Sequence, residues 1–364
     1  MTVELASTVV TPGGLLSPGA VEVEDGRIVA VEPTSGTVPY RILAPGLVDL
    51  QVNGIDDIDV ATAEGDDWDR LDELLVAQGV TAWCPTLVTG PPDGYAKPLA
   101  RIAEAAERPG ARPLIIGAHL EGPFLGSRHG AHPHDLVIPA DLEWLAALPE
   151  IVCLVTLGAE DAATGDAIRS LVDQGVVVSI GHTGADLAQA HDAIDAGARL
   201  VTHGYNAMSA LDHRAPGMVG AFLTDDRVTV SLIADLVHVH PVALDIAFRC
   251  KPADRVVLVS DAVAWRGRRV GAIDIEHDGT VPRLADGTLA GSSLVLDEAI
   301  ANVVHHCGVP LERAVASASS VPAALLDLDD CGAIEVGRSA DLVALDPGSL
   351  RCTTTWIAGQ QVHG

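Results

Sequence analysis

The chain has 364 residues, more than a single hydrophobic core usually supports, so we expect one large domain with a smaller companion. Its formal net charge is −28, from 22 basic and 50 acidic residues, which argues against nucleic acids and anionic membrane surfaces as partners. The 48% of hydrophobic residues, together with 36 Gly and 22 Pro, are typical of an α/β protein with many short turns.

Residues 1–42 show the alternation of apolar and polar residues that is typical of short β-strands. Within this segment, Asp25 and Gly26 form a turn signal between two such strands. A sheet of this size does not bury enough apolar surface to be stable alone. We therefore expect another part of the chain to complete it.

Residues 43–332 alternate apolar runs with Ala-rich amphipathic stretches. Eight apolar runs can be counted: LAPGLVDLQVN, GVTAWCPTL, LIIGAHLEG, IVCLVTLGAE, VVVSIGHTG, LVTHGYNAM, TVSLIADLVHV and RVVLVSDAV. Eight such β/α units predict a (β/α)8 TIM-type barrel, in which catalytic residues lie at the C-terminal ends of the strands.

Residues 333–364 again place turn residues between short apolar strands. We predict that the two ends of the chain form one small β-sandwich domain beside the barrel. The six cysteines are scattered without a CxxC pair, and no segment has the pattern of a signal peptide or a membrane span. These features predict a cytoplasmic protein with free thiols.

Ionisable side chains follow the predicted strands at four places. The third run ends with Glu121, the fifth and sixth with His182 and His203, and the eighth with Asp261. A single histidine in such a place is more often a hydrogen-bonded core residue, but four coincidences in one barrel favour a site. One carboxylate and two imidazoles suit Zn²⁺ or a similar divalent ion with an open coordination position. Asp261 is then placed to move a proton from a water to a leaving amine.

Eight motifs in register resemble the N-acetylglucosamine-6-phosphate deacetylase family of the amidohydrolase superfamily: LAPGLVDLQVNG, AHLEGPF, SIGHTGAD, THGYNAM, IADLVHVHP, LVSDA, LAGSSL and GAIEVGRSADLVALD. LVSDA alone would be a weak signal, whereas eight motifs in the same order, from about residue 42 to the C-terminus, are specific. The resemblance implies hydrolysis of an N-acetyl amino-sugar 6-phosphate to acetate and the free amine. No organic cofactor is needed.

The resemblance also implies roles for individual residues. Glu121, His182 and His203 would be the metal ligands, and Asp261 would be the general base and acid. His132 would polarise the acetyl carbonyl and stabilise the oxyanion, although its position alone is typical of a solvated loop residue.

For the substrate, the resemblance points to Asn206, Ala207, Arg214 and His238. In relatives, the residues that match Arg214 and His238 bind the sugar phosphate across a dimer interface, which implies a homodimer. A lone surface arginine is usually a solvated charge, but a guanidinium is a suitable bidentate phosphate clamp. A protein this acidic needs such a local cation to bind an anionic ligand.

Two positions depart from the wider pattern. Many amidohydrolases carry His-x-His after the first strand and bind two metals, whereas this chain has Gln51 and Asn53, whose neutral amides ligate metals weakly. We therefore expect one divalent ion per chain, with Zn²⁺ the preferred identity, and Gln51 and Asn53 close to its water. Gly204 stands where THxxNAM suggests a bulkier residue, which leaves the local packing open.

Alternative functions are an N-acetylgalactosamine 6-phosphate deacetylase and a deacetylase of an unphosphorylated acetamido sugar, because a sequence does not separate epimers. A different class is a catalytically silent barrel that acts as a binding protein. Such a protein would be expected to lack Asp261 or a metal ligand, and this chain has all four residues.

Overall fold

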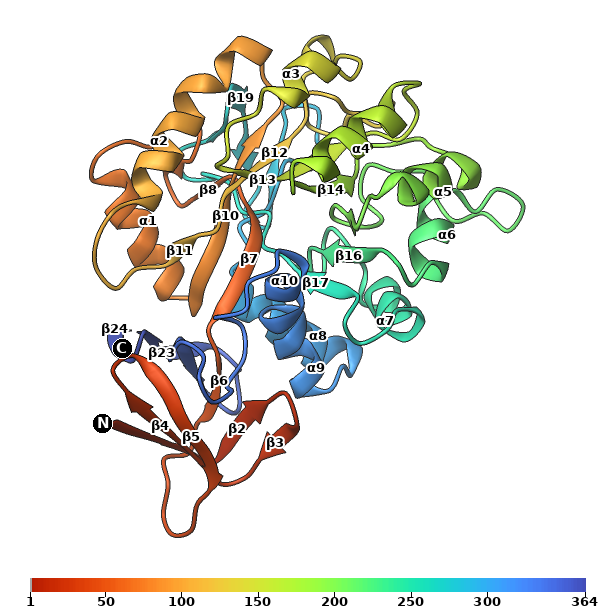
Figure 1. The fold of residues 1–364 in the computed structure, drawn as a ribbon. Helices are drawn as coiled ribbons and strands as arrows, with labels where there is room; N and C mark the ends of the chain where they lie inside the picture. Colours follow the sequence, from red (N-terminus) through yellow and green to blue (C-terminus); the bar gives the residue numbers. More distant parts are fainter. Residues whose placement is uncertain (1) are drawn as a thin grey trace.

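A computed structural model describes residues 2–364 as a large barrel with a small β domain beside it (Figure 1). Both chain ends lie in the small domain, at the lower left of Figure 1. None of the helices within residues 2–364 has the length and apolar character needed to cross a bilayer.

The small domain consists of two sheets, one of which combines strands from both ends of the chain. Its strands are β1 (Thr2–Ala6), β2 (Thr8–Thr11), β3 (Gly14–Leu16), β4 (Gly19–Glu24), β5 (Arg27–Pro33), β6 (Ile42–Pro45), β22 (Leu342–Leu345), β23 (Cys352–Ile357) and β24 (Gln360–His363). One sheet has the order β1-β4-β5 and the other β24-β23-β22-β6-β2-β3. Leu43, Leu342 and Trp356 are buried in a core that both ends share. The prediction of a β domain formed by both termini is confirmed.

The barrel contains eight parallel strands, one from each predicted apolar run. They are β7 (Leu47–Val52), β10 (Val80–Val88), β12 (Ala118–Glu121), β13 (Val152–Leu157), β14 (Val177–Ile180), β15 (Leu200–Val201), β16 (Thr229–Leu232) and β17 (Val256–Leu258). Neighbours in the sequence pair with each other, β7 with β10 and then in order to β17, and the short β11 (Leu114–Ile115) pairs alongside β10. A parallel bridge between Val52 of β7 and Ala262, four residues beyond β17, connects the two ends of this strand order. The prediction of a (β/α)8 barrel is confirmed.

The first apolar run is divided between the two units. The N–H of Gly46 donates to Asp341 O of the small domain at 2.8 Å, and the next N–H, of Leu47, donates to Gly79 O of the barrel at 2.9 Å. The chain therefore passes from one sheet to the other at Gly46. The barrel strand begins at Leu47, and not at residue 43 as the apolar pattern suggested.

Helices surround the barrel (Figure 1). They are α1 (Asp67–Val76), α2 (Ala96–Ala106), α3 (Leu142–Ala146), α4 (Thr164–Asp173), α5 (Leu187–Ala196), α6 (Gly217–Thr224), α7 (Pro241–Cys250), α8 (Leu296–Cys307), α9 (Leu311–Ser317) and α10 (Ser320–Leu325), with 3₁₀ turns at Pro92–Gly94 and His134–Leu136. In α4, Ala167, Ile168 and Leu171 form the buried face, which is the periodicity of an amphipathic helix.

An insertion of 37 residues, 259–295, separates β17 from α8. It contains four two-residue strands, β18 (Arg269–Val270), β19 (Ile273–Asp274), β20 (Glu276–His277) and β21 (Pro282–Arg283). Two further short strands, β8 (Gly54–Ile55) and β9 (Ile58–Asp59), follow β7. Val263, Val270, Ile275 and Ala290 give the insertion a small core of its own.

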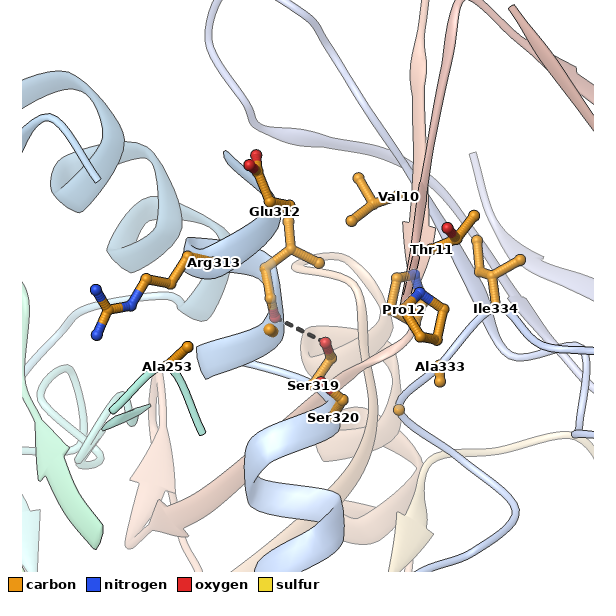
Figure 2. Close-up of a pocket in the computed structure, with 14 residues that line it drawn as sticks. Val10, Thr11, Pro12, Ala253, Glu312, Arg313, Ser319, Ser320, Ala333 and Ile334 are labelled. Carbon is orange, nitrogen blue, oxygen red and sulfur yellow. Dashed lines mark hydrogen bonds between the residues drawn. The ribbon is translucent and has the colours of Figure 1, made fainter. Parts of the chain in front are cut away.

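A cavity of about 330 Å³ lies between the small domain and α9–α10 (Figure 2). Val10, Pro12 and Ile334 line it on the side of the small domain. On the opposite side, the Ser319 hydroxyl donates to Val315 O at 2.7 Å and so is already satisfied. No group of converging ionisable side chains is present in this cavity, within the part of the chain described, so it offers no chemistry.

Gly204 packs into the barrel core, which answers the packing question that the sequence left open. A Cβ there would lie 2.5 Å from Val230 Cγ2 and 3.3 Å from Phe222 Cζ. These two side chains occupy the space that a larger residue at 204 would need.

We therefore expect Gly204→Leu to lower the free energy of unfolding by about 1–3 kcal/mol through overpacking. Phe222→Leu in the same chain should restore part of the loss, as measured by urea unfolding. Gly13→Leu is the control, because a Cβ at Gly13 meets nothing nearer than 3.7 Å. Equal stability of Gly204→Leu and the parent would show that this packing has been misjudged.

Candidate active site

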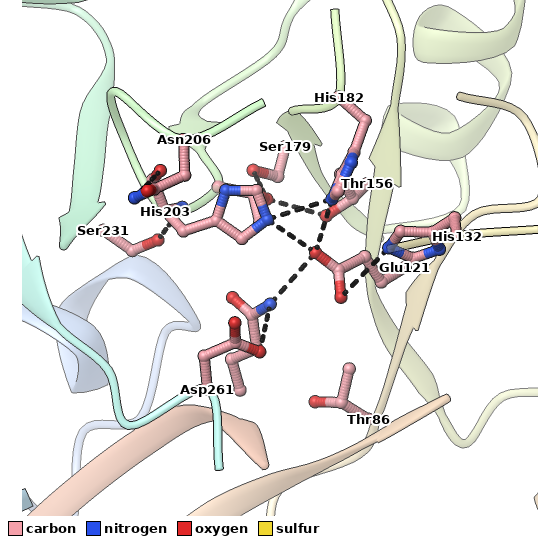
Figure 3. Close-up of polar contacts among 12 residues, drawn as sticks. Thr86, Glu121, His132, Thr156, Ser179, His182, His203, Asn206, Ser231 and Asp261 are labelled. Atoms are coloured by element: carbon pink, nitrogen blue, oxygen red, sulfur yellow. Dashed lines mark hydrogen bonds and ion pairs between the residues drawn. The ribbon is translucent and has the colours of Figure 1, made fainter. Parts of the chain in front are cut away.

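Four buried side chains meet at the C-terminal ends of the barrel strands (Figure 3). Glu121 is the last residue of β12, His182 is the second residue after β14, and His203 and Asp261 lie just beyond β15 and β17. His182, His203 and Asp261 have φ values of 48°, 34° and 49°. Left-handed backbone at three non-glycine residues is costly and clusters at functional sites. The structure thus brings together the four residues nominated from the sequence.

Glu121, His182 and His203 point one atom each at a common centre. Glu121 Oε1 lies 3.2 Å from His182 Nε2 and 2.9 Å from His203 Nε2, and the two nitrogens are 3.0 Å apart. Neighbouring ligands around tetrahedral zinc, with bonds of 2.0–2.1 Å, are separated by about 3.3 Å. The donor set and its spacing therefore fit a divalent cation.

The imidazole of His182 is held in the tautomer that a metal ligand needs. Its Nδ1 lies 3.2 Å from Arg128 O and 3.1 Å from His129 O. Carbonyl oxygens only accept, so Nδ1 carries the proton and Nε2 presents a lone pair to the common centre.

A second group, in which His132 takes the place of His203, could also hold a cation, since ligand atoms of Glu121, His132 and His182 lie within 4.8 Å of one another. His132 Nε2 is 3.9 Å from Glu121 Oε2, however, and its Nδ1 already contacts Thr89 Oγ1 at 2.8 Å. The group with His203 is tighter, and we take it as the candidate metal centre.

His132 reaches the site from the loop of residues 122–133 and is buried. The backbone N–H of Thr89 lies 3.4 Å from its Nδ1, so Nδ1 accepts and the ring proton is on Nε2. Burial, followed by the nearby His182, lowers the pKa of His132 to about 3. His132 is therefore a neutral donor whose N–H faces the site.

Asp261 is oriented by the two amides of the Gln51–Asn53 segment. Gln51 Nε2 and Asn53 Nδ2 donate to its Oδ1 at 3.0 and 2.8 Å, and Gln51 Nε2 also lies 3.0 Å from Glu121 Oε1. Burial, followed by repulsion from Glu121, raises the pKa of Asp261 to about 8. A cation at the candidate centre would favour the ionised form.

Glu121 carries the negative charge of the centre. Burial alone would raise the pKa of its carboxyl, but the adjacent imidazoles of His182 and His203 hold that pKa well below its usual range. Against the same burial, the bond to Glu121 raises the pKa of His203. An anionic carboxylate beside two imidazoles is the arrangement that attracts a cation.

A row of neutral groups lies under the centre. His119 Nε2 is 2.8 Å from Thr156 Oγ1, which is 2.7 Å from Thr202 Oγ1, and Ser179 Oγ lies 2.5 Å from Thr202 Oγ1. Burial lowers the pKa of His119 to about 4, so it is neutral at pH 7. These groups satisfy one another and place no additional charge beneath the centre.

A cavity of about 240 Å³ opens onto the candidate metal centre. Nine of the residues considered from the sequence line it: Asn53, Glu121, His132, His182, His203, Asn206, Ala207, His238 and Asp261. The rest of the wall is largely apolar and comes mainly from the insertion after β17, with Val270, Ile273 and Leu289. Sequence reasoning missed this wall, because the short strands of the insertion carry no clear periodicity.

Arg214 is the one proposed substrate residue that lies elsewhere. It is exposed on the loop of residues 209–216 and does not line the cavity. Within residues 2–364, no lysine or arginine lines the cavity at all. The described lining of the cavity thus offers no permanent cation to a bound anion.

His238 is fixed by a carboxylate that the sequence analysis did not single out. Asp235 Oδ2 lies 2.7 Å from His238 Nδ1, and Asp235 Oδ1 accepts the N–H groups of Val237 and His238 at 2.9 and 2.8 Å. The pair leaves His238 Nε2 as the atom available to a ligand. The Asp-x-x-His spacing in IADLVHVHP was the signal that could have found it.

Comparisons with known proteins agree with this geometry. A sequence model of the amidohydrolase family matches residues 42–362. The chain is 38% identical to the N-acetylgalactosamine-6-phosphate deacetylase of Escherichia coli O157:H7, over 98% of this chain and 97% of that one. It is 40% identical to the N-acetylglucosamine-6-phosphate deacetylase of Danio rerio, over 88% and 84%. A solved structure of similar fold is an aspartate-to-alanine variant of the Mycobacterium smegmatis N-acetyl-D-glucosamine-6-phosphate deacetylase in complex with N-acetyl-D-glucosamine-6-phosphate. Its TM-score with this chain is 0.94 at 34% identity, and the match covers 100% of this chain and 99% of that chain.

The geometry predicts one bound divalent ion per chain. His182→Ala should lower the metal content measured by elemental analysis, with the far-UV circular dichroism spectrum preserved, because a ligand beyond a strand end is not part of the core. His305→Ala, on the exposed face of α8, is the matched control. Two ions per chain, or full metal content in His182→Ala, would overturn the assignment.

Proposed function

Because this chain belongs to the amidohydrolase family, we propose that it hydrolyses the N-acetyl group of N-acetylglucosamine 6-phosphate to glucosamine 6-phosphate and acetate. Its relatives over nearly the full length are N-acetylated amino-sugar 6-phosphate deacetylases. The observation that carries the proposal is one cavity that holds three convergent ligand atoms, a neutral histidine donor and a separate buried carboxylate.

Glu121, His182 and His203 would hold one divalent ion, and their oxygen and nitrogen donors suit Zn²⁺. When bound, such an ion supplies Lewis-acid chemistry and makes water a better nucleophile at neutral pH. Gln51 and Asn53 are turned toward Asp261, so they support a single ion.

His132 would donate its Nε2–H to the acetyl carbonyl oxygen. This hydrogen bond strengthens as negative charge builds on that oxygen, and a donor already in place needs no reorganisation during the reaction. A neutral imidazole suits the role, because it keeps its proton throughout.

Asp261 would accept a proton from the attacking water and deliver it to the amide nitrogen as the C–N bond breaks. Its Oδ1 is held by the two amides, whereas Oδ2 has no hydrogen-bond partner among the residues described. The carboxylate is thus fixed at one oxygen and free at the other, as a proton shuttle requires.

The phosphate would be bound in a homodimer, with Arg214 of one subunit closing the cavity of the other. The guanidinium of Arg214 makes no ion pair within residues 2–364, and Leu211 on the same loop has an exposed fraction of 57%. An unpaired cation beside an exposed apolar side chain supports a second copy as the partner. Asn206, Ala207 and His238 would bind the sugar.

The galacto epimer is a second candidate substrate, because the relative from Escherichia coli is named for it. A silent binding protein is disfavoured, since the proton-shuttle carboxylate and all three ligand atoms converge.

The cytoplasmic location stays a prediction, supported by six free cysteines.

Asp261→Asn should lower kcat on N-acetylglucosamine 6-phosphate by about 10²–10⁴-fold, because an amide is nearly isosteric but does not shuttle a proton. Metal content and substrate binding should be preserved, and Asp274→Asn, on the exposed surface of the insertion, should be unaffected. A loss below about tenfold would assign proton transfer to another group.

Arg214→Ala should lower kcat/KM by about ten- to a hundredfold on phosphorylated substrates, which corresponds to one charge-assisted contact of roughly 1.5–3 kcal/mol. The dephosphorylated sugar should be hydrolysed as before, and Arg169→Ala, in an exposed pair with Asp166, is the control. An equal loss of kcat/KM on the phosphorylated and dephosphorylated sugars would show that Arg214 has a structural role and does not bind the phosphate.

The dimer can be tested by mixing the two inactive variants. Random exchange of Asp261→Asn and Arg214→Ala chains gives heterodimers with one intact site, so about a quarter of the parent activity should return. No recovery, although chains exchange, would place the phosphate clamp within one subunit.

A further inference from the structure

The carboxylate of Glu160, just beyond β13, collects four hydrogen bonds although it does not line the cavity. Glu160 Oε1 accepts from Ser127 N at 3.0 Å, from Ser127 Oγ at 2.9 Å and from Gly184 N. Glu160 Oε2 accepts from Thr183 Oγ1 at 2.5 Å. Burial alone would raise the pKa of Glu160, but these donors hold that pKa below its usual range, so the group is an anion.

The four donors belong to the two segments that surround His182. Thr183 and Gly184 follow His182 directly in the chain. Ser127 lies in the loop of residues 122–133, which carries His132. One carboxylate therefore connects the end of β14 to the loop above it.

The residues on either side of Ser127 hold His182 directly. The N–H groups of Gly126 and Arg128 donate to His182 O at 3.0 and 3.4 Å. In the other direction, His182 Nδ1–H donates to Arg128 O and His129 O. The position of Ser127 thus determines the positions of Arg128 O and His129 O, which accept from the His182 ring.

This close approach depends on two glycines. A Cβ at Gly126 would overlap Glu160 Oε2, and a Cβ at Gly158 would overlap the backbone nitrogen of Gly126. Neither glycine has a positive φ, so space, and not backbone conformation, requires them. The two segments can meet around the carboxylate only because these side chains are absent.

We propose that Glu160 is a positioning residue that orients His182 for metal binding, through Ser127 on one side and Thr183–Gly184 on the other. Within the described chain no lysine or arginine pairs with Glu160, so only N–H and O–H donors stabilise its negative charge. The inference rests on the proposed function, in which His182 is a ligand. Groups of this kind, beyond the ligands themselves, typically contribute 10- to 100-fold to metal affinity.

The experiment compares Glu160→Ala with Glu160→Gln. The glutamine keeps an oxygen for Ser127 and Gly184, and its NH₂ can donate to Thr183 Oγ1, so it should retain the geometry. Asp161→Ala is the matched control, because Asp161 belongs to the same loop but its side chain accepts only from Ala163 N, just before α4. The Zn²⁺ dissociation constant is measured by competition with a chelator, and hydrogen exchange of residues 124–130 and 182–185 is measured on the metal-free protein.

In Glu160→Ala, exchange in both segments should rise and the Zn²⁺ dissociation constant should increase about 10- to 100-fold. Glu160→Gln and Asp161→Ala should stay within about threefold of the parent protein in both measurements, given the spread of measured interaction energies. If Glu160→Ala does not fold, Ser127→Ala, which removes only one hydroxyl, should still increase the dissociation constant several-fold.

Hydrogen exchange that is unchanged in Glu160→Ala overturns this proposal and leaves the proposed function intact. The same holds if Glu160→Ala keeps the Zn²⁺ affinity of the parent while His182→Ala loses its metal. A glutamine variant as impaired as the alanine variant also overturns it, because the loss would then follow charge and not geometry. Full metal content in both His182→Ala and Glu160→Ala would overturn the proposed function and this inference together.

Discussion

Three buried atoms, Glu121 Oε1, His182 Nε2 and His203 Nε2, lie 2.9–3.2 Å apart, and the surrounding structure keeps them there. Two imidazole nitrogens at that spacing repel each other unless a cation or a proton lies between them. Three features offset this repulsion. The strand ends fix the backbone, two backbone carbonyls fix the His182 tautomer, and Glu121 supplies one negative charge. In the proposed function, proton transfer and carbonyl polarisation fall to separate groups, Asp261 and His132.

Much of this arrangement could be predicted from the sequence, for a physical reason. Strands of a closed parallel barrel are buried on both sides, so they appear as continuous apolar runs, and the polar residue that ends each run marks the functional edge. Glu121, His182, His203 and Asp261 were found in that way. His132 was not, because a loop has no periodicity, and only the family resemblance pointed to it.

What the sequence could not provide were contacts between segments far apart in the chain. Gln51 and Asn53 were expected to remove a second metal site and to lie close to the water of the first, but the sequence did not show that their amides orient Asp261, some 210 residues away in the chain. The apolar wall from the insertion and the carboxylates of Asp235 and Glu160 became visible only once the loops were placed. The division of the first run at Gly46 was also hidden, because two successive N–H groups bond to different sheets.

The central claim is that the cavity acts on an acetamido sugar that carries a 6-phosphate. It is tested most directly by kcat/KM measured side by side for N-acetylglucosamine 6-phosphate, its galacto epimer and unphosphorylated N-acetylglucosamine. The account predicts that either phosphorylated sugar exceeds the unphosphorylated one by about tenfold or more, the contribution of one charge-assisted phosphate contact. Equal values with and without phosphate, or no release of acetate from any of the three by the metal-loaded protein, would contradict it.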